Sequence, residues 1–117
     1  MTEKIITEYP KPEWDEDVGK SYIGKYILVG ITYRDGGGKD IGKQQIHGVI
    51  ESASEEDGIV IKLKGKHEGE TWFMPPDQRS ISEARPRIYS LRESGEEIEN
   101  PDLLSTWIEE NAEEENT

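Results

Sequence analysis

KYILVGITY, residues 25–33, is an almost continuous run of apolar, β-branched and aromatic residues, and it decides the fold class. In an extended strand, successive side chains point to opposite faces. The odd-numbered positions from Ile27 to Tyr33 therefore share one face, and Tyr26, Leu28 and Thr32 share the other. Because apolar side chains stand on both faces, we expect a central strand, or one that an N-terminal arm covers.

Strand and turn signals continue along the chain from this run. The glycine-rich stretch RDGGGKDIGK (34–43) contains an Asp-Gly pair, which predicts a hairpin loop. Gly30 and Gly48 lie inside strands, where glycine often marks a bulge or a barrel corner. Further strands are expected at residues 44–52, 58–64, 71–74, 80–82 and 87–91.

These signals predict an all-β fold, a small, partly open antiparallel barrel or roll of about five to six short strands. In strand length and turn spacing the pattern resembles Src-homology-3-like or Tudor-like barrels. We expect residues 20–108 to form this single small β domain. Residues 1–19 are expected to form an N-terminal arm that packs on the body through Trp14, and residues 109–117 an acidic disordered tail.

The segment 101–108 has two interpretations. Asn100 and Pro101 have the residue types of a helix N-cap and a first helical position. Apolar residues then follow at helical spacing on one face. We therefore predict a short C-terminal helix, with a strand that closes the barrel as the alternative. In either case Trp107 is expected to be buried against the body.

Composition narrows the class of protein. The chain has 117 residues and a formal net charge of −12, with no cysteine, which excludes disulfide scaffolds, thiolate zinc sites and cysteine nucleophiles. The acidity is at the ends: residues 93–117 hold ten acidic residues and no Lys or Arg. No apolar run approaches the roughly 18–20 residues of a membrane-spanning helix, and no secretory signal is visible. We expect a cytoplasmic protein without a membrane partner.

No complete catalytic set emerges. GGKDIGK (37–43) matches the spacing of a phosphate-binding loop, but Gln44 stands where Ser or Thr is needed and a strand follows instead of a helix. His47 could pair with Glu51, two positions along one strand face, and Glu70 or Asp77 are other candidate partners for it. An ordinary polar pair is the simpler interpretation. We therefore expect no enzyme, no metal site and no cofactor.

The function that this sequence favours is non-catalytic protein binding, through an aromatic groove or an exposed strand edge. The groove residues are Tyr33, Trp72, Phe73 and Tyr89. One alternative is an acidic inhibitor or immunity-type protein that neutralises a basic enzyme. The other is a barrel that binds single-stranded nucleic acid through Lys62, Lys64 and Lys66, which the acidic ends disfavour. A protein partner and a monomer or weak homodimer are expected.

Overall fold

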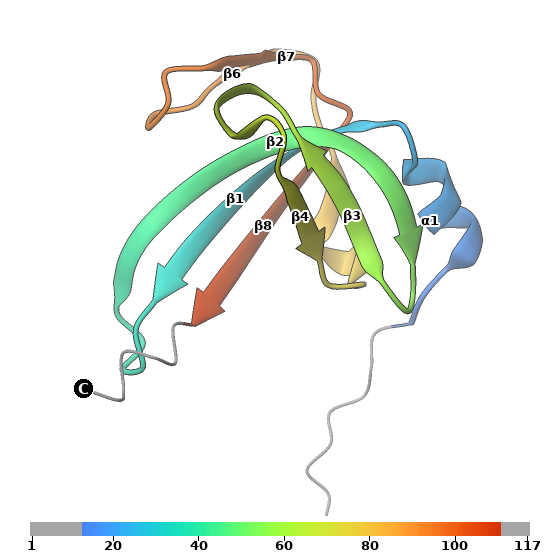
Figure 1. Cartoon of the computed structure of the whole chain (residues 1–117), viewed down its shortest axis with the longest axis horizontal. Coiled ribbons are helices and arrows are strands. Elements are labelled where there is room, and N and C mark those ends of the chain that lie inside the picture. Colours follow the sequence, from blue (N-terminus) through green and yellow to red (C-terminus); the bar gives the residue numbers. More distant parts are fainter. Residues whose placement is uncertain (1–12, 111–117) are drawn as a thin grey trace, which may run out of the picture.

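The computed structural model describes residues 13–110, and its fold is mostly β (Figure 1). One α-helix, two single-turn 3₁₀ helices and eight strands follow along these residues. In chain order they are α1 (Glu16–Tyr22), β1 (Tyr26–Arg34), β2 (Asp40–Ser54), β3 (Gly58–Leu63), η1 (Gly65–His67), β4 (Thr71–Met74), η2 (Gln78–Ser80), β5 (Ile81–Glu83), β6 (Ile88–Ser90), β7 (Glu97–Glu99) and β8 (Leu103–Glu110).

Six strands form one sheet in the order β4-β3-β2-β1-β8-β5, and β6 and β7 form a separate hairpin. Within residues 13–110 the end strands β4 and β5 do not pair with each other, so the sheet is not closed. The predicted all-β class is confirmed. The antiparallel prediction needs one correction, because β1 and β8 run parallel, in register from Ile27 opposite Leu103 to Arg34 opposite Glu110.

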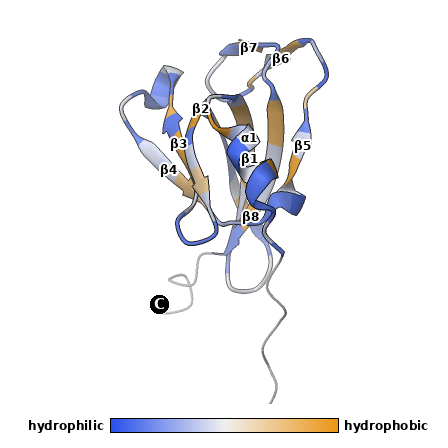
Figure 2. Cartoon of the chain, turned by 90° about the vertical axis from the view of Figure 1, so that its right-hand side faces the viewer, coloured by the Kyte–Doolittle hydropathy of each residue, from blue (hydrophilic) through white to orange (hydrophobic). Residues whose placement is uncertain are grey.

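Both faces of β1 are covered, which explains its apolar pattern. Ile27, Val29 and Ile31 belong to the main core, and we call their side of the sheet the inner face. Leu28, on the outer face, belongs to a second core with Leu91 and Ile98. The β6–β7 hairpin therefore covers the outer face of β1. The sequence pattern alone allowed either a central position in the sheet or a strand covered by an N-terminal arm. Figure 2 shows hydrophobic residues along the strands and hydrophilic residues at the turns.

The first hairpin forms where the Asp-Gly pair predicts it. Residues 35–39 connect β1 to β2, and the Asp35 carboxylate accepts hydrogen bonds from the backbone N–H groups of Gly37 and Lys39, both at 2.9 Å. No helix follows, because residues 40–54 are one long curved strand (Figure 1). The prediction that a strand, and not a helix, follows the glycine-rich loop is therefore confirmed.

The predicted C-terminal helix is wrong. Residues 103–110 form strand β8, which lies between β1 and β5. Asn100 is not a helix cap; it has a left-handed conformation (φ 49). The local helix signals do not decide the structure here, because this segment pairs with β1 along its whole length. Tertiary contacts of this kind commonly override helix propensity.

The predicted terminal segments are described only in part. Glu16–Tyr22 of the N-terminal region is helical, and the Asp15 side chain caps this helix by accepting the N–H of Val18 at 3.1 Å. Trp14 packs against the main core. Residues 1–12 of the predicted arm and 111–117 of the predicted acidic tail lie outside the described residues. The first two tail residues, Glu109 and Glu110, belong to β8.

Candidate functional site

The four predicted groove residues lie on different faces of the sheet. Tyr33 and Trp72 both pack against the main core from the inner face. Phe73 follows Trp72 in β4, points to the opposite face and is 63% exposed. Tyr89 is in the covering hairpin, packed against the second core. The structure therefore brings Tyr33 and Trp72 to one face and separates Phe73 and Tyr89 from them.

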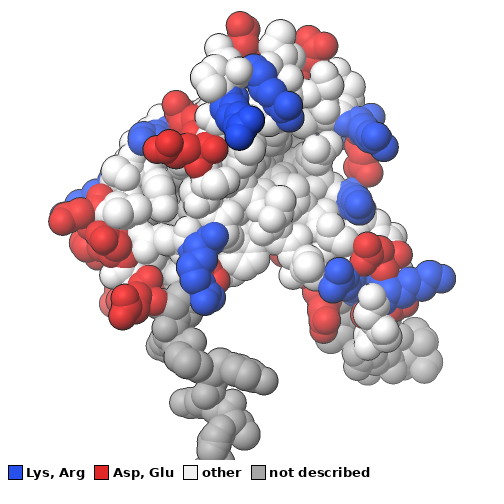
Figure 3. All heavy atoms as spheres, turned by 180° about the vertical axis from the view of Figure 1, so that it is seen from behind, with Lys and Arg blue, Asp and Glu red and all other residues white. Residues whose placement is uncertain are grey.

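The three lysines of the predicted basic face lie in a strand and in the turn after it. Lys62 is in β3, whereas Lys64 and Lys66 lie in the turn that follows. Lys62 Nζ is 4.0 Å from Glu51 Oε2. On the face shown in Figure 3, basic and acidic side chains are interspersed around an uncharged central area. A continuous basic stripe is the usual electrostatic feature of a nucleic-acid site, and that face has none.

His47 makes contacts that its sequence neighbours did not indicate. It is 5% exposed, its Nδ1 lies 2.7 Å from the Tyr26 hydroxyl, and its Nε2 lies 3.2 Å from Glu96 Oε1. A carboxylate only accepts, so Nε2 donates to Glu96, and Nδ1 shares the other hydrogen bond with the Tyr26 hydroxyl. Both ring nitrogens are thus engaged by protein groups. The expected partner, Glu51, lies beside Lys62 instead.

The Glu96 carboxylate connects three parts of the fold. It accepts hydrogen bonds from His47, from the Ser94 hydroxyl at 2.8 Å and from the Lys66 backbone N–H at 3.0 Å. Burial raises the pKa of Glu96, but these hydrogen bonds and the charge of His47 outweigh it, so its pKa lies below the ordinary value. The arrangement stabilises the ionised carboxylate and holds η1 and the β6–β7 connection against β2.

The candidate site is the open edge of β8. β8 has 8 residues, but β5 pairs only with the first three, from Leu103 to Ser105. Among residues 13–110, no strand lies beside Thr106–Glu110 on that side, although β1 pairs with this stretch on the other. Backbone N–H and C=O groups that face away from β1 are therefore available along this edge. Such a row of groups can pair with another chain.

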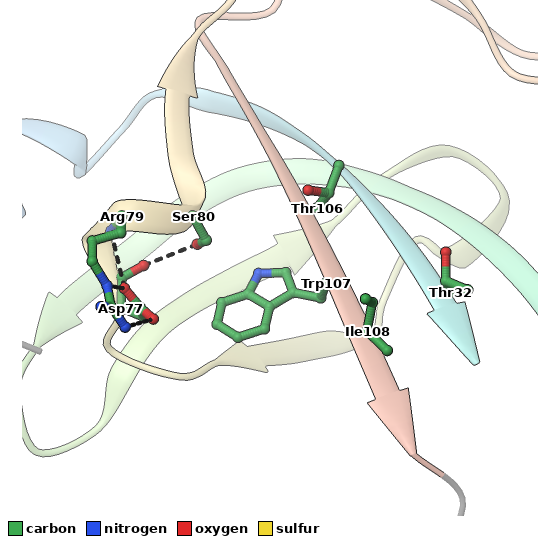
Figure 4. Close-up of a pocket in the computed structure, with 7 residues that line it drawn as sticks. All are labelled: Thr32, Asp77, Arg79, Ser80, Thr106, Trp107 and Ile108. Carbon is green, nitrogen blue, oxygen red and sulfur yellow. Dashed lines mark hydrogen bonds and ion pairs between the residues drawn. The ribbon is translucent and has the colours of Figure 1, made fainter. Parts of the chain in front are cut away.

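Trp107 stands at the beginning of this edge, on the inner face, and packs against the main core. A cavity of about 500 Å³ lies beside it, lined by Thr32, Asp77, Arg79, Ser80, Thr106, Trp107 and Ile108 (Figure 4). The Trp107 Nε1 atom is buried and has no hydrogen-bond partner within the described part of the chain. A buried donor left without an acceptor costs about 1–3 kcal/mol.

The open edge of β8 ends at the η2 turn on the side of β5. Pro75 and Pro76 end β4 and lead into η2. The Ser105 hydroxyl donates to Ser80 Oγ at 3.1 Å, which fixes η2 to β8 where β5 begins. Arg79 donates to both carboxylate oxygens of Asp77 at 2.8 Å, and these hydrogen bonds lower the pKa of Asp77. The walls of the cavity are therefore held by defined contacts.

The far end of the edge is acidic. Glu109 and Glu110 are exposed, and Ile108 on the outer face is 52% exposed. Tyr33 is opposite Glu109 in the β1–β8 register, and its hydroxyl donates to Gln44 Oε1 at 2.7 Å. Burial raises the pKa of Tyr33, and the Glu109 charge raises it further. The edge thus offers an aromatic ring and a cavity at one end and negative charge at the other.

Comparisons with protein-family models, with curated proteins and with solved structures find no match. Within residues 13–110, no group of three or more His, Cys, Asp or Glu residues is placed to hold a metal ion. The one α-helix of that region has seven residues, and none of its helices has the length and apolar character needed to cross a bilayer. The candidate site therefore rests on geometry and on the sequence itself.

The residue pattern predicts a buried Trp107 but does not place this side chain in a binding site. A strand signal was present in residues 103–110, because apolar residues occur on both faces, as they do in the β1 run. No such local signal in the sequence indicates that β5 is much shorter than β8. The open edge arises from that difference in length, so sequence patterns alone could not locate it.

Proposed function

We propose that this protein is a non-catalytic protein-binding module that receives an extended segment of a partner along the open edge of β8. The observation that carries the proposal is the run Thr106–Glu110, which is paired on one side only. Added strands bind through main-chain hydrogen bonds, and pockets for alternate side chains give specificity. Here the pocket is the cavity beside Trp107.

The edge of β8 is better suited to this role than either end of the sheet. β4 has four residues and β5 has three, and such short edge strands are a common protection against unwanted pairing. The open part of β8 is longer than both. A partner segment that continues the line of β5 would run antiparallel to β8, as β5 does.

The side chains beside the edge define the chemistry of the partner. An apolar side chain of the added segment would enter the cavity next to Trp107, and another would contact Ile108 on the outer face. Glu109 and Glu110 favour a basic residue at the far end of the segment. This preference for a basic partner also fits the inhibitor-type alternative, in which the chain neutralises a basic enzyme.

Site-specific photo-crosslinking tests the proposal in the full-length protein. A photoreactive amino acid replaces Ile108 in one variant and Phe73, an exposed residue of β4, in the control. We expect one heterologous adduct from position 108 and none from position 73, and amide hydrogen exchange of residues 106–110 should slow in the purified complex. Equal adducts at both positions, unchanged exchange, or a crosslinked homodimer would each overturn it.

A further inference from the structure

A second cavity lies on the outer face, further along β1 than the second core. Its volume is about 660 Å³, within the range of small-molecule sites. The sheet forms its floor through Gly30 and Thr106, and the residues that follow β6, among them Arg92 and Glu93, form a wall. It is separate from the edge-binding proposal, although Thr32 and Thr106 line both cavities.

Gly30 creates the depth of this hollow, and the backbone does not require glycine there. A Cβ at Gly48 would collide with the Lys62 carbonyl oxygen, so the close approach of β3 demands glycine at that position. At Gly30 a Cβ would meet only Thr106 Cγ2, at an ordinary 3.9 Å, and the backbone φ is not positive. Glycine in a strand interior costs stability and often marks close approach of a ligand.

Two cations face the hollow. Lys43 projects from the outer face of β2, and Arg92 projects from the segment after β6. Neither forms an ion pair within residues 13–110, although the chain carries a net charge of −12. Arg binds carboxylate and phosphate groups through paired N–H donors, and Lys binds them as a point charge.

Neutral polar side chains complete the lining. Thr32, Thr106, Gln45 and Ser90 all border the hollow, and none of them makes a side-chain hydrogen bond to the described protein. Their hydroxyl and amide groups can donate and accept. Glu93 can accept from a hydroxyl group. The lining therefore matches a ligand that has one anionic end and a hydroxylated body.

We propose that this hollow binds a small hydroxylated anion, a phosphorylated or carboxylated polyol or sugar. Its anionic group lies between Lys43 and Arg92, and its body lies over Gly30 against the two threonines. The glycine leaves room for that body, and the hydroxyl groups bond to the surrounding side chains.

An NMR titration of the full-length protein tests this assignment with four probes. Glycerol 3-phosphate represents the phosphorylated class and gluconate the carboxylated class, whereas inorganic phosphate and glycerol each represent one half of a ligand. We expect saturable shifts of the Gly30, Thr32 and Thr106 amides with at least one of the first two. Inorganic phosphate should bind at least about tenfold more weakly than that probe, and glycerol should produce no saturable shift.

Substitutions of residues that line only this hollow show whether the ligand binds there. Gly30→Val fills the floor with a residue that favours strands, and Lys43→Gln and Arg92→Gln each remove a cation. All three should weaken binding at least about tenfold, while Lys39→Gln at the hairpin tip should bind as the wild type does. Gly30→Val should still crosslink through position 108, which separates this proposal from the edge.

The proposal is overturned by any of three results. The first is binding as tight as that of the wild type by Gly30→Val, in a variant whose amide spectrum is otherwise that of the folded wild type. The second is a set of amide shifts centred on residues 62–66. The third is the absence of a saturable shift with glycerol 3-phosphate and with gluconate at about 10 mM.

Discussion

His47 Nε2 lies 3.2 Å from Glu96 Oε1, and this contact joins strand β2 to the connection between β6 and β7 across 49 residues of sequence. Tyr26 completes the chain of contacts on the other ring nitrogen. Buried polar networks of this kind stabilise a fold when every member is satisfied, and they are sensitive to the loss of any one. The covering hairpin is therefore held by hydrogen bonds as well as by the second core.

Stability should decrease at acid pH through Glu96. Because its pKa is lower in the folded protein than the ordinary 4.5, the carboxylate stabilises the fold above that value, and the contribution is lost as the pH falls through the folded pKa. Glu96→Gln should cost about 1–2 kcal/mol at pH 7 and much less at pH 3, measured by urea unfolding. Glu93→Gln, an exposed change in the same turn, is the control. An equal difference at both pH values would contradict the assignment.

The Tyr26 hydroxyl should contribute measurably through His47. Tyr26→Phe leaves His47 Nδ1 without its hydrogen-bond partner and should cost about 1 kcal/mol in the free energy of unfolding. Tyr89→Phe is the matched control, since the Tyr89 hydroxyl donates to an exposed carbonyl, that of Arg85. It should cost a few tenths of a kcal/mol. Similar losses in the two variants would show that the His47 contact adds nothing.

Local patterns predicted the parts of this fold that local chemistry controls. The two-faced run around Val29 and the Asp35-Gly36 pair correctly indicated a central strand and its hairpin. The pairing of His47 with Glu96 has no local signature, and Glu51 was the nearer carboxylate in sequence. The same reason explains the error over residues 101–108, because the parallel register with β1 involves residues more than 70 positions away.

The two strand glycines should respond in opposite ways to alanine. Gly48→Ala places a Cβ against the Lys62 carbonyl and should cost at least about 2 kcal/mol. Gly30→Ala meets no close neighbour and should stabilise the protein by about 0.5 kcal/mol, since glycine is a poor strand residue. Chemical unfolding of both variants measures the difference. If Gly30→Ala were the more damaging change, our account of the hollow's floor would be wrong.

Asn100 distinguishes the strand from the predicted helix. In a helix N-cap, serine would replace asparagine without loss, whereas glycine would cost a few tenths of a kcal/mol. In the observed left-handed conformation, glycine is the favoured replacement and serine is strained. Thermal unfolding should therefore show Asn100→Gly at or above wild-type stability and Asn100→Ser about 1 kcal/mol lower. The reverse order would support the helix.

Trp107 should matter more for partner binding than for folding. Trp107→Phe keeps an aromatic ring on the main core and removes the buried Nε1–H that has no acceptor within residues 13–110. The lost apolar area is small, so the free energy of unfolding should be unchanged or raised by up to about 2 kcal/mol. The change also reduces the aromatic wall of the cavity beside the β8 edge, so affinity for the crosslinked partner should fall about tenfold. Trp72→Phe, on the same face but in β4, should leave that affinity unchanged. A Trp107→Phe protein that unfolds more easily yet binds its partner normally would show that the ring serves only the core.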